Sequence, residues 1–473
     1  MKSKMIFLIC LLCLFISGCG EKKEKLVLAT EASFAPYEYY DNEKIVGVDI
    51  DIAREIAKEL DMELVIKDVF FDSIISEIKA GKSDIGAAGI SYTEERSKEV
   101  DFTINYMDSK QILVVRKNSD INGPIDLVNR KVAVQLGTVG DDYLTSNYPN
   151  LEIIREKKFL AAIEDLLDYK VDVVVMDEIP ARELINDKLM ILAEPLVVDH
   201  YGMIVKKGND ELLNTANKVI KRLKEEGKID EMILTHLGVK KEKNNNTIID
   251  KFYNSVIYDG RYKFILEGLK NTLIIAIGAV ILGTIFGTGM ALIRNIHDTK
   301  GKLKILNIFA KIYITVIRGT PSILQLMIIY YVIFKTSNIS IILVGILSFG
   351  INSGAYVAEI VRAGINSVPV GQKEAGLALG LRYFDIMKHI IIPSALRNIL
   401  PALGNEFITL VKETSVGAYI GIIELTKASD IIASRTYDYF FPLALIAIIY
   451  LVITIVLSKL INLMEKRLNN ARN

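Results

Sequence analysis

The feature that most constrains this chain is an apolar stretch at residues 273–293 that contains no Asp, Glu, Lys or Arg. A helix of about 20 apolar residues is long enough to cross the hydrocarbon core of a bilayer. Further apolar stretches follow at about residues 319–334, 339–360, 399–421 and 440–457. Residues 261–473 are therefore predicted to form an all-α transmembrane domain with about five helices.

Residues 26–240 have a different pattern, in which short apolar strands alternate with amphipathic helices. Residues 25–30 are typical of a buried strand, and residues 49–60 carry apolar side chains at helical spacing. This alternation predicts parallel sheets with crossover helices, and the segment is long enough for two such α/β lobes. The polar run at residues 240–246 indicates a linker, which we place at residues 241–260.

The first 19 residues are typical of an export signal. Lys2 and Lys4 precede an apolar run of about a dozen residues, and small residues then lead to Cys19. This ending is similar to the processing site of bacterial lipoproteins, so we predict a lipoprotein-type signal at residues 1–19 with Cys19 lipidated. An uncleaved signal anchor is the alternative. Cys10, Cys13 and Cys19 are the three cysteines of the chain, which excludes a disulfide-stapled fold.

The charges of the loops indicate the orientation in the membrane. Residues 294–318, 361–397 and the C-terminal tail are rich in Lys and Arg, whereas residues 335–338 and 422–439 hold few. By the positive-inside rule, the basic segments lie in the cytoplasm and the N-terminal domain lies outside. We therefore expect a multi-pass protein of the cytoplasmic (inner) membrane with an extracytoplasmic binding domain. With 57 basic and 57 acidic residues, the chain has no basic excess that would favour nucleic acid.

Four short motifs follow one another in the soluble part: residues 30–38 (TEASFAPYE), 89–96 (GISYTEER), 135–138 (QLGT) and 176–177 (MD). In this order they resemble the bacterial amino-acid-binding proteins of the lysine/arginine/histidine/glutamine type. The resemblance covers residues 26–240 and implies a bilobal α/β domain of the two-hinge type that binds one L-amino acid.

The resemblance also implies which groups bind the amino-acid backbone. Arg96 would hold the carboxylate, because only a guanidinium offers a planar two-pronged donor, and Ser91 and Thr138 would add donors. Asp177 and the carbonyl of Gly89 would hold the ammonium group. Taken alone, Arg96 lies in a charged run typical of a solvated helix face, and Asp177 could equally cap a helix.

Four further residues match positions that surround the ligand side chain. Phe34 and Phe71 match aromatic residues that enclose it, and such rings hold flat or cationic groups well. Glu31 matches an acidic residue at the distal end, and Gln135 suits either ligand class. This set favours arginine or lysine over glutamine. Ordinary core packing is the alternative for both Phe residues.

Residues 318–321 (RGTP), 355–362 (AYVAEIVR) and 371–380 (GQKEAGLALG) resemble the permease subunits of polar amino-acid importers of the ATP-driven (ABC) type. The segment that holds Glu374, Ala375, Gly376 and Gly380 is similar to the coupling helix that docks on a separate ATPase subunit. An amphipathic surface helix between two spans is the alternative.

Together the two resemblances imply a subunit of an amino-acid importer that forms a homodimer through its permease domain. ATP would be hydrolysed by separate ABC ATPase subunits. Residues 81–83 (GKS) lack the glycine five residues earlier that a phosphate-binding loop needs. We expect no catalytic residues, no metal site and no cofactor in this chain. The alternatives are a ligand-gated receptor or sensor with the same binding fold, and an enzyme on that fold.

Overall fold

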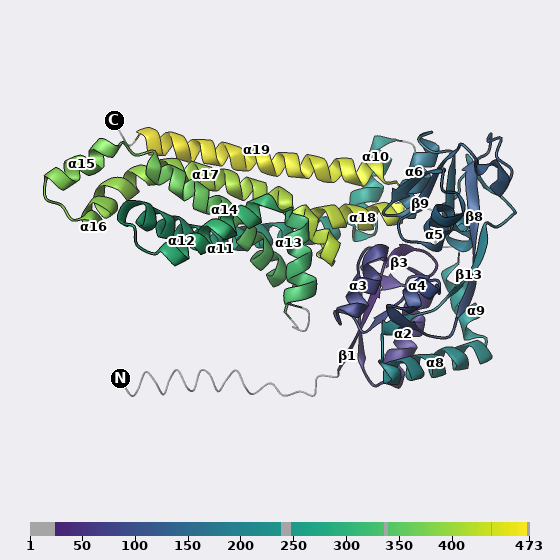
Figure 1. Cartoon of the computed structure of the whole chain (residues 1–473). Helices are drawn as coiled ribbons and strands as arrows, with labels where there is room; N and C mark the ends of the chain where they lie inside the picture. Colours follow the sequence, from purple (N-terminus) through teal and green to yellow (C-terminus); the bar gives the residue numbers. More distant parts are fainter. Residues whose placement is uncertain (1–23, 238–246, 335–338, 437, 471–473) are drawn as a thin grey trace.

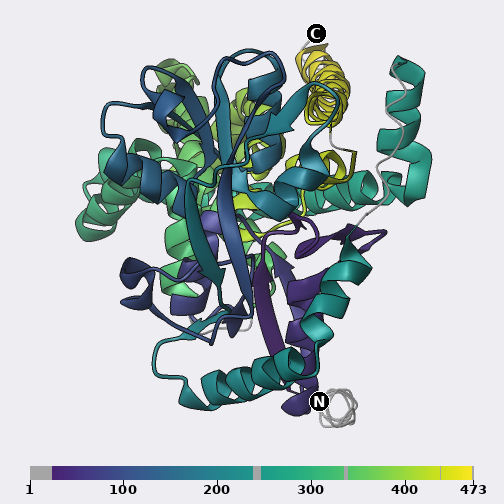
Figure 2. The same cartoon turned by 90° about the vertical axis from the view of Figure 1, so that its right-hand side faces the viewer.

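The computed structural model describes residues 24–237, 247–334, 339–436 and 438–470. The predicted signal at residues 1–19 with Cys19 and the polar run at residues 240–246 lie outside these described residues. The structure confirms a two-lobed α/β domain followed by a helical domain. Figure 1 shows the helical domain as an elongated bundle with the two lobes at one end, and Figure 2 shows both lobes in front of the bundle.

Lobe 1 is built on a five-stranded sheet in the order β5-β1-β6-β14-β7. Its strands are β1 Lys25–Thr30, β5 Glu63–Asp68, β6 Ile85–Gly86, β7 Val100–Phe102 and β14 Ile204–Lys206. Its helices are α2 Val48–Glu59, α3 Ile74–Lys79, α4 Glu94–Ser97, α8 Asp210–Glu225 and α9 Lys228–His236. A small antiparallel sheet of β2 Ser33–Phe34, β3 Glu38–Asp41 and β4 Lys44–Val46 extends from it.

Lobe 2 is built on a second sheet in the order β10-β9-β11-β8-β12, with β13 also paired to β8. Its strands are β8 Met107–Arg116, β9 Lys131–Gln135, β10 Glu152–Glu156, β11 Val173–Asp177, β12 Leu189–Ile191 and β13 Val197–Tyr201. Its helices are α5 Val139–Asn147, α6 Phe159–Leu167 and α7 Glu178–Leu184. The chain passes between the lobes after β7 and again after β13, which gives two hinge strands.

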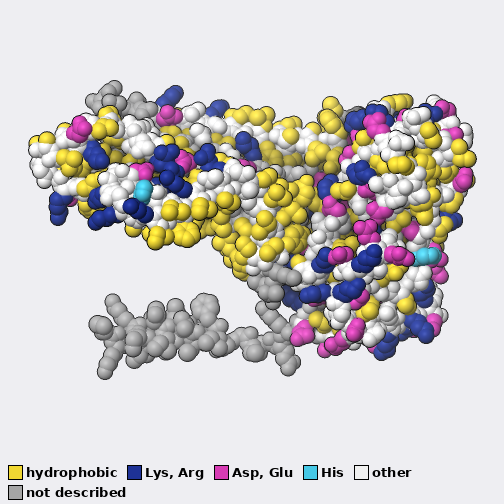
Figure 3. All heavy atoms as spheres, viewed as in Figure 1, with side chains coloured by type: hydrophobic (Ala, Val, Ile, Leu, Met, Phe, Trp, Pro, Cys, Tyr) yellow, Lys and Arg dark blue, Asp and Glu magenta, His cyan; other side chains and the backbone are white. Residues whose placement is uncertain are grey.

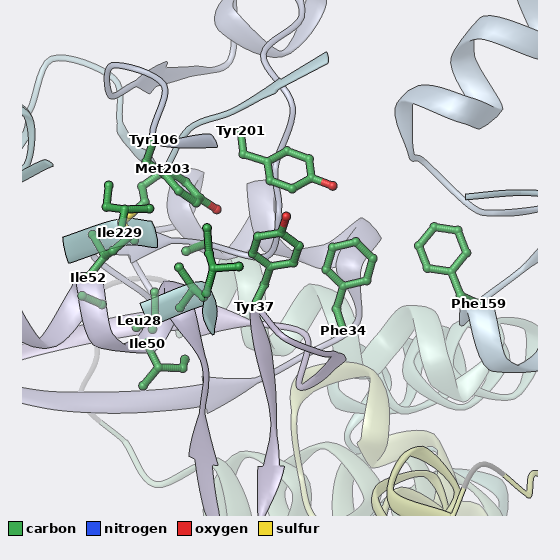
Figure 4. Close-up of a cluster of buried hydrophobic side chains, with 14 of the residues drawn as sticks. Leu28, Phe34, Tyr37, Ile50, Ile52, Tyr106, Phe159, Tyr201, Met203 and Ile229 are labelled. Carbon is green, nitrogen blue, oxygen red and sulfur yellow. The ribbon is translucent and has the colours of Figure 1, made fainter. Parts of the chain in front are cut away.

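The predicted parallel sheets are correct only in part, because both sheets are mixed. β1 runs parallel to β5 and β6, but β14 is antiparallel to both β6 and β7, and β8 is antiparallel to β11. β8 and β14 each enter their sheet from the other lobe without a crossover helix, which a parallel neighbour would need. One continuous apolar core nevertheless runs through both lobes, from Leu28 and Ile52 to Phe34 and Phe159 (Figure 4).

The helical domain begins with the short α10 Ile248–Phe252, so the second half of the predicted linker is helical. The long helices are α11 Tyr262–Lys300, α12 Lys304–Gly319, α14 Ile341–Asn366, α17 Ile392–Glu413 and α19 Phe440–Asn470. Shorter elements join them: α13 Ser322–Ile328, α15 Val370–Ala378, α16 Tyr383–Ile386, the 3-10 turn Thr414–Ile420 and α18 Leu425–Thr436. Residues 422–439, which we interpreted as an outer loop, thus contain a helix.

Among the described residues, three helices are long and apolar enough to cross a membrane: α11, α14 and α19. α12 and α13 with its extension to Ile333 make a fourth candidate span only as a pair bent by 111°. The bend falls at Pro321, whose ring has no N–H for a helical hydrogen bond. The predicted fourth span corresponds to α17, which carries Glu406, Lys412 and Glu413 and does not pass the same test. Hydrophobic side chains cover the middle of the bundle (Figure 3).

Candidate ligand-binding site

A small cavity lies in the cleft between the two lobes. Eight of the predicted ligand residues line it: Glu31, Phe34, Phe71, Gly89, Ser91, Gln135, Thr138 and Asp177. Five further residues line it that the sequence analysis did not select: Glu38, Ala88, Gln111, Val139 and Phe159. A larger hollow between part of lobe 1 and the helical bundle is lined by none of the predicted ligand residues.

Arg96 lies at the edge of this cavity and spans the cleft. Its Nη1 donates to the Ser91 carbonyl at 2.8 Å in lobe 1, and its Nη2 donates to the Gly137 carbonyl at 2.7 Å in lobe 2. The Thr93 hydroxyl caps the short helix α4 by accepting a hydrogen bond from the Arg96 backbone N–H at 3.1 Å. This bond fixes the backbone from which the Arg96 side chain extends. The guanidinium also lies over the Phe71 ring, 5.8 Å from its centroid. A buried guanidinium at this place can receive a carboxylate.

Asp177 ends β11 and points into the cavity. Its Oδ1 accepts hydrogen bonds from Ser109 Oγ at 2.9 Å, from Gln111 Nε2 at 2.7 Å and from the Tyr201 hydroxyl. Burial, and then the negative charge of Asp199, raises the pKa of Asp177 to about 7. A buried carboxyl group with a second carboxyl group beside it favours a cation between them.

Asp199 and Tyr201 are site residues that the sequence analysis missed. Both lie on β13, whose antiparallel pairing with β8 brings them beside Asp177. The Ser91 hydroxyl donates to Asp199, so this contact also crosses the cleft. Burial raises the pKa of Asp199 despite the hydrogen bonds from Ser91 and Gln111. In the sequence, Val197, Asp199 and Tyr201 occupy every second position, which is the pattern of a strand that points one face inward.

A second pair of carboxyl groups, Glu38 and Asp49, lies beneath the cavity in lobe 1. Both side chains are fully buried. Burial and the neighbouring Asp49 raise the pKa of Glu38 well above its usual range, and burial raises that of Asp49 to about 6. Asp49 Oδ2 accepts from the Gly89 backbone N–H at 3.0 Å. Gly89 has φ 54°, and a Cβ there would lie 2.7 Å from the Phe34 ring, so glycine is required.

The aromatic residues are arranged differently from the predicted enclosure by Phe34 and Phe71. Opposite Phe34 the structure places Phe159 of lobe 2, with the ring centroids 5.7 Å apart and the planes at 24° (Figure 4). Tyr37 stacks on the other side of Phe34 at 5.5 Å. Phe71 instead faces the Arg96 guanidinium. Phe159 follows a lysine pair at the start of α6, a local sequence that gave no sign of a pocket residue.

The distal end of the cavity contains Glu31 and Gln135. Glu31 is 3% exposed and its Oε1 lies 3.3 Å from Lys158 Nζ of lobe 2. Gln135 Nε2 donates to the Lys157 carbonyl at 3.1 Å. Thr138 accepts from the Asp141 backbone N–H at 3.4 Å and thereby caps α5 above the cavity.

The predicted coupling segment lies at the far end of the bundle from the two lobes (Figure 1). Glu374, Ala375 and Gly376 lie on α15, and Gly380 follows it with φ 75°. A Cβ at Gly376 would lie 2.9 Å from Ile386 Cγ1, so the small residue lets α15 pack on the next helix.

Comparison with known proteins assigns a family to each half. Residues 26–239 match the bacterial extracellular solute-binding proteins, family 3, and residues 279–470 match the binding-protein-dependent transport system inner membrane component. The putative glutamine transport system permease protein GlnP of Rickettsia typhi is 39% identical, over 46% of this chain and 96% of that protein. The arginine transport system permease protein ArtQ of Bacillus subtilis is 38% identical, over 44% and 93%.

Among solved structures, a mutant of ArgBP from T. maritima is 38% identical over 45% of this chain and 95% of that chain, with a TM-score of 0.44. An ancestral arginine-binding protein bound to glutamine is 36% identical over 46% and 99%, with a TM-score of 0.43. The matches to the permease relatives cover nearly their whole length, and the solute-binding family covers the lobes that precede them. The chain therefore belongs to the polar and basic amino-acid ABC importers, as a transporter subunit in which a family 3 solute-binding domain is joined to its permease.

Proposed function

We propose that this subunit captures a cationic L-amino acid, arginine or lysine, outside the cytoplasmic membrane and passes it to its own permease domain, with glutamine as the second candidate. The observation that carries this proposal is the excess of buried carboxyl groups around the cavity. Glu31, Glu38 and Asp177 line it and Asp49 and Asp199 are buried close behind, whereas Arg96 and Lys158 are cations beside them.

A bound amino acid brings one negative and one positive group through its own backbone. Arg96 and the hydroxyl of Ser91 suit the carboxylate, and Asp177 with Asp199 suits the ammonium group. This backbone pairing leaves the excess of carboxyl groups unchanged. A guanidinium or ammonium group on the ligand side chain would reduce it, and the stacked rings of Phe34 and Phe159 would have to move apart to hold a flat cation between them.

The names of the relatives span both candidate ligands. ArtQ is named for arginine and GlnP for glutamine, and they match the permease half of this chain about equally well. The distinction between the ligands therefore rests on the binding domain and its charges.

Two features support an extracytoplasmic binding domain and a separate ATPase. The basic segments at residues 294–318 and 361–397 contain the ends of the bundle helices remote from the lobes, including α15. Such basic segments favour the cytoplasmic side. There Glu374 and Gly376 on α15 would dock on an ABC ATPase subunit. We expect a homodimer, and α12 offers an apolar face for it through Ile305, Ile308, Phe309, Ile312 and Val316, all exposed.

The test is calorimetric titration of the full chain in detergent with L-arginine, L-lysine, L-histidine and L-glutamine. We expect arginine or lysine to bind most tightly. Glu31→Gln should weaken arginine binding about tenfold more than glutamine binding, or by about 1.4 kcal/mol more, because loss of the ion pair with Lys158 affects both ligands. Glu152→Gln, a half-exposed carboxylate of lobe 2, is the matched control. Tight binding of glutamine alone would overturn the preference for a cation, and binding of none of the four would overturn the site.

A further inference from the structure

Five ionisable side chains with little exposure lie where lobe 1, lobe 2 and the permease domain touch. Glu31 and Asp68 come from lobe 1, Lys158 from lobe 2, and Lys427 and Asp430 from α18 of the permease. We infer that Lys158 is a positioning residue that links closure of the lobes around the amino acid to docking on α18, through Glu31 on one side and Asp430 on the other. The inference rests on the proposed function of the cavity.

Lys158 joins the two lobes directly. It is the residue before α6 and is 5% exposed, and its Nζ lies 3.3 Å from Glu31 Oε1. Glu31 also lines the ligand cavity. Because this ion pair crosses the cleft, moving lobe 2 away from lobe 1 would separate its two charges.

Lys158 also faces the permease. Its charge interacts with Asp430 of α18, which is 6% exposed, as well as with Glu31 and Asp68. Burial raises the pKa of Asp430, and the positive charges of Lys158 and Lys427 oppose that rise. The ionised form of Asp430 therefore depends on Lys158 remaining beside it.

A second ion pair fixes lobe 1 to the same helix. Lys427 is fully buried and its Nζ lies 2.8 Å from Asp68 Oδ2. Asp68 Oδ1 accepts from the backbone N–H of Ala32, the neighbour of Glu31, at 3.1 Å. The position of Glu31 is thus tied to α18 through Asp68, independently of Lys158.

Apolar packing keeps water away from these charges. Ala32 and Tyr40 of lobe 1 pack with Phe264 of α11 and with Ala428 and Ile431 of α18 in one buried cluster. Phe70 of lobe 1 contacts Tyr419 in the turn before α18, with ring centroids 5.3 Å apart. Charge pairs in such surroundings are screened little, so losing one partner has a large effect.

The arrangement predicts that closure of the lobes around the amino acid and docking of the lobes on α18 stabilise each other. With the lobes closed, Lys158 pairs with Glu31 and its charge also acts on Asp430; with the lobes open, Asp430 loses the influence of this charge. A docked permease therefore favours the closed lobes, and by linkage a bound amino acid favours the docked permease. α18 packs against both α11 and α19, so a change at Asp430 acts on two of the long membrane helices.

The test is a double-mutant cycle on the full chain in lipid nanodiscs, with L-arginine binding as the readout, or L-glutamine if the wild type binds only that. We expect Lys158→Met and Asp430→Asn each to weaken binding about fivefold or more, although Asp430 does not line the cavity. The double variant should be no weaker than the weaker single variant. Lys158→Arg should retain most of the wild-type affinity, and Lys170→Met, an exposed lysine of lobe 2, is the matched control.

Wild-type affinity in Asp430→Asn, or losses that add fully in the double variant, would overturn the inference. Thermal unfolding midpoints of every variant show whether it is folded, and the conservative Asp430→Asn and Lys158→Arg keep the test decisive if Lys158→Met does not fold. Absence of amino-acid binding by the wild type would instead overturn the proposed function, so the two failures are distinguishable.

Discussion

The ligand cavity and the junction with the permease both contain buried ionisable groups. They differ in how far nearby cations offset the effect of burial on the pKa of their carboxyl groups. Around the cavity, burial raises the pKa of Asp177 to about 7 and that of Asp49 to about 6. At the junction, burial alone would also raise the pKa of Asp68, yet Lys427 and Lys158 hold it below its usual range. The protein thus supplies cations to its junction, where Asp68 is paired although the pKa of Asp430 stays raised, and supplies fewer to the carboxyl groups of the cavity.

This difference indicates what each region is built for. A junction whose charges are already paired within the chain gives a defined geometry between domains. A cavity with surplus carboxyl groups gains free energy when a charged ligand arrives. Removing a cation from either region tests this difference directly. Changing the protonation state of the carboxyl groups around the cavity tests it more finely.

The largest effect is expected at the junction. Lys427→Met removes the ion-pair partner of Asp68, which costs up to about 3–5 kcal/mol. We expect the thermal unfolding midpoint of the full chain in detergent to fall by about 3–5 °C. The double variant Lys427→Met with Asp68→Asn should regain most of this loss, because it removes both charges. A wild-type midpoint in the single variant would show that the junction is not held by this pair.

A smaller effect is expected from the guanidinium of Arg96, which lies beside the cavity. Arg96→Ala should weaken amino-acid binding at least about 100-fold, or about 2.7 kcal/mol, because the ligand carboxylate loses its two-pronged donor. Titration of the full chain measures this loss. The affinity of Arg96→Lys should lie between those of the wild type and Arg96→Ala, since an ammonium group cannot make both hydrogen bonds in one plane. Binding within threefold of the wild type in Arg96→Ala would mean that another group holds the carboxylate.

The sequence alone predicted the local elements well. β1 occurs as expected, and α2 begins and ends within one residue of the predicted helix. Local signals were strong here, because apolar spacing distinguishes strands from helices within a few residues. Eight predicted ligand residues line one cavity because motifs at strand ends converge at the cleft. Their role as ligand residues stays a prediction.

The features that were missed depend on pairing over long distances in the chain. Asp199 and Tyr201 lie beside Asp177 and Gln111 only because β13 pairs with β8, about 90 residues earlier. The charges of Lys158 and Asp430 interact only because the lobes dock on α18. In the sequence, Lys427 and Asp430 lie in a weakly apolar segment that is typical of an exposed loop, and only the covering lobe makes them buried.

The smallest expected effect is that of pH on the cavity. Lowering the pH stabilises the ligand-free fold but weakens ligand binding. The pKa of Asp177 rises from its usual 3.8 to about 7 in the folded chain, so protonation stabilises the ligand-free fold. That stabilisation is complete below about pH 3.8 and is lost as the pH rises through about 7. Ligand binding changes the other way, because only ionised Asp177 attracts the ammonium group. Between pH 7.5 and 5.5 we therefore expect affinity for L-arginine to fall at least about tenfold, measured by titration. Asp177→Asn should bind weakly and show little of this slope; an unchanged slope would assign the titration to another carboxyl group, with Asp199 the nearest.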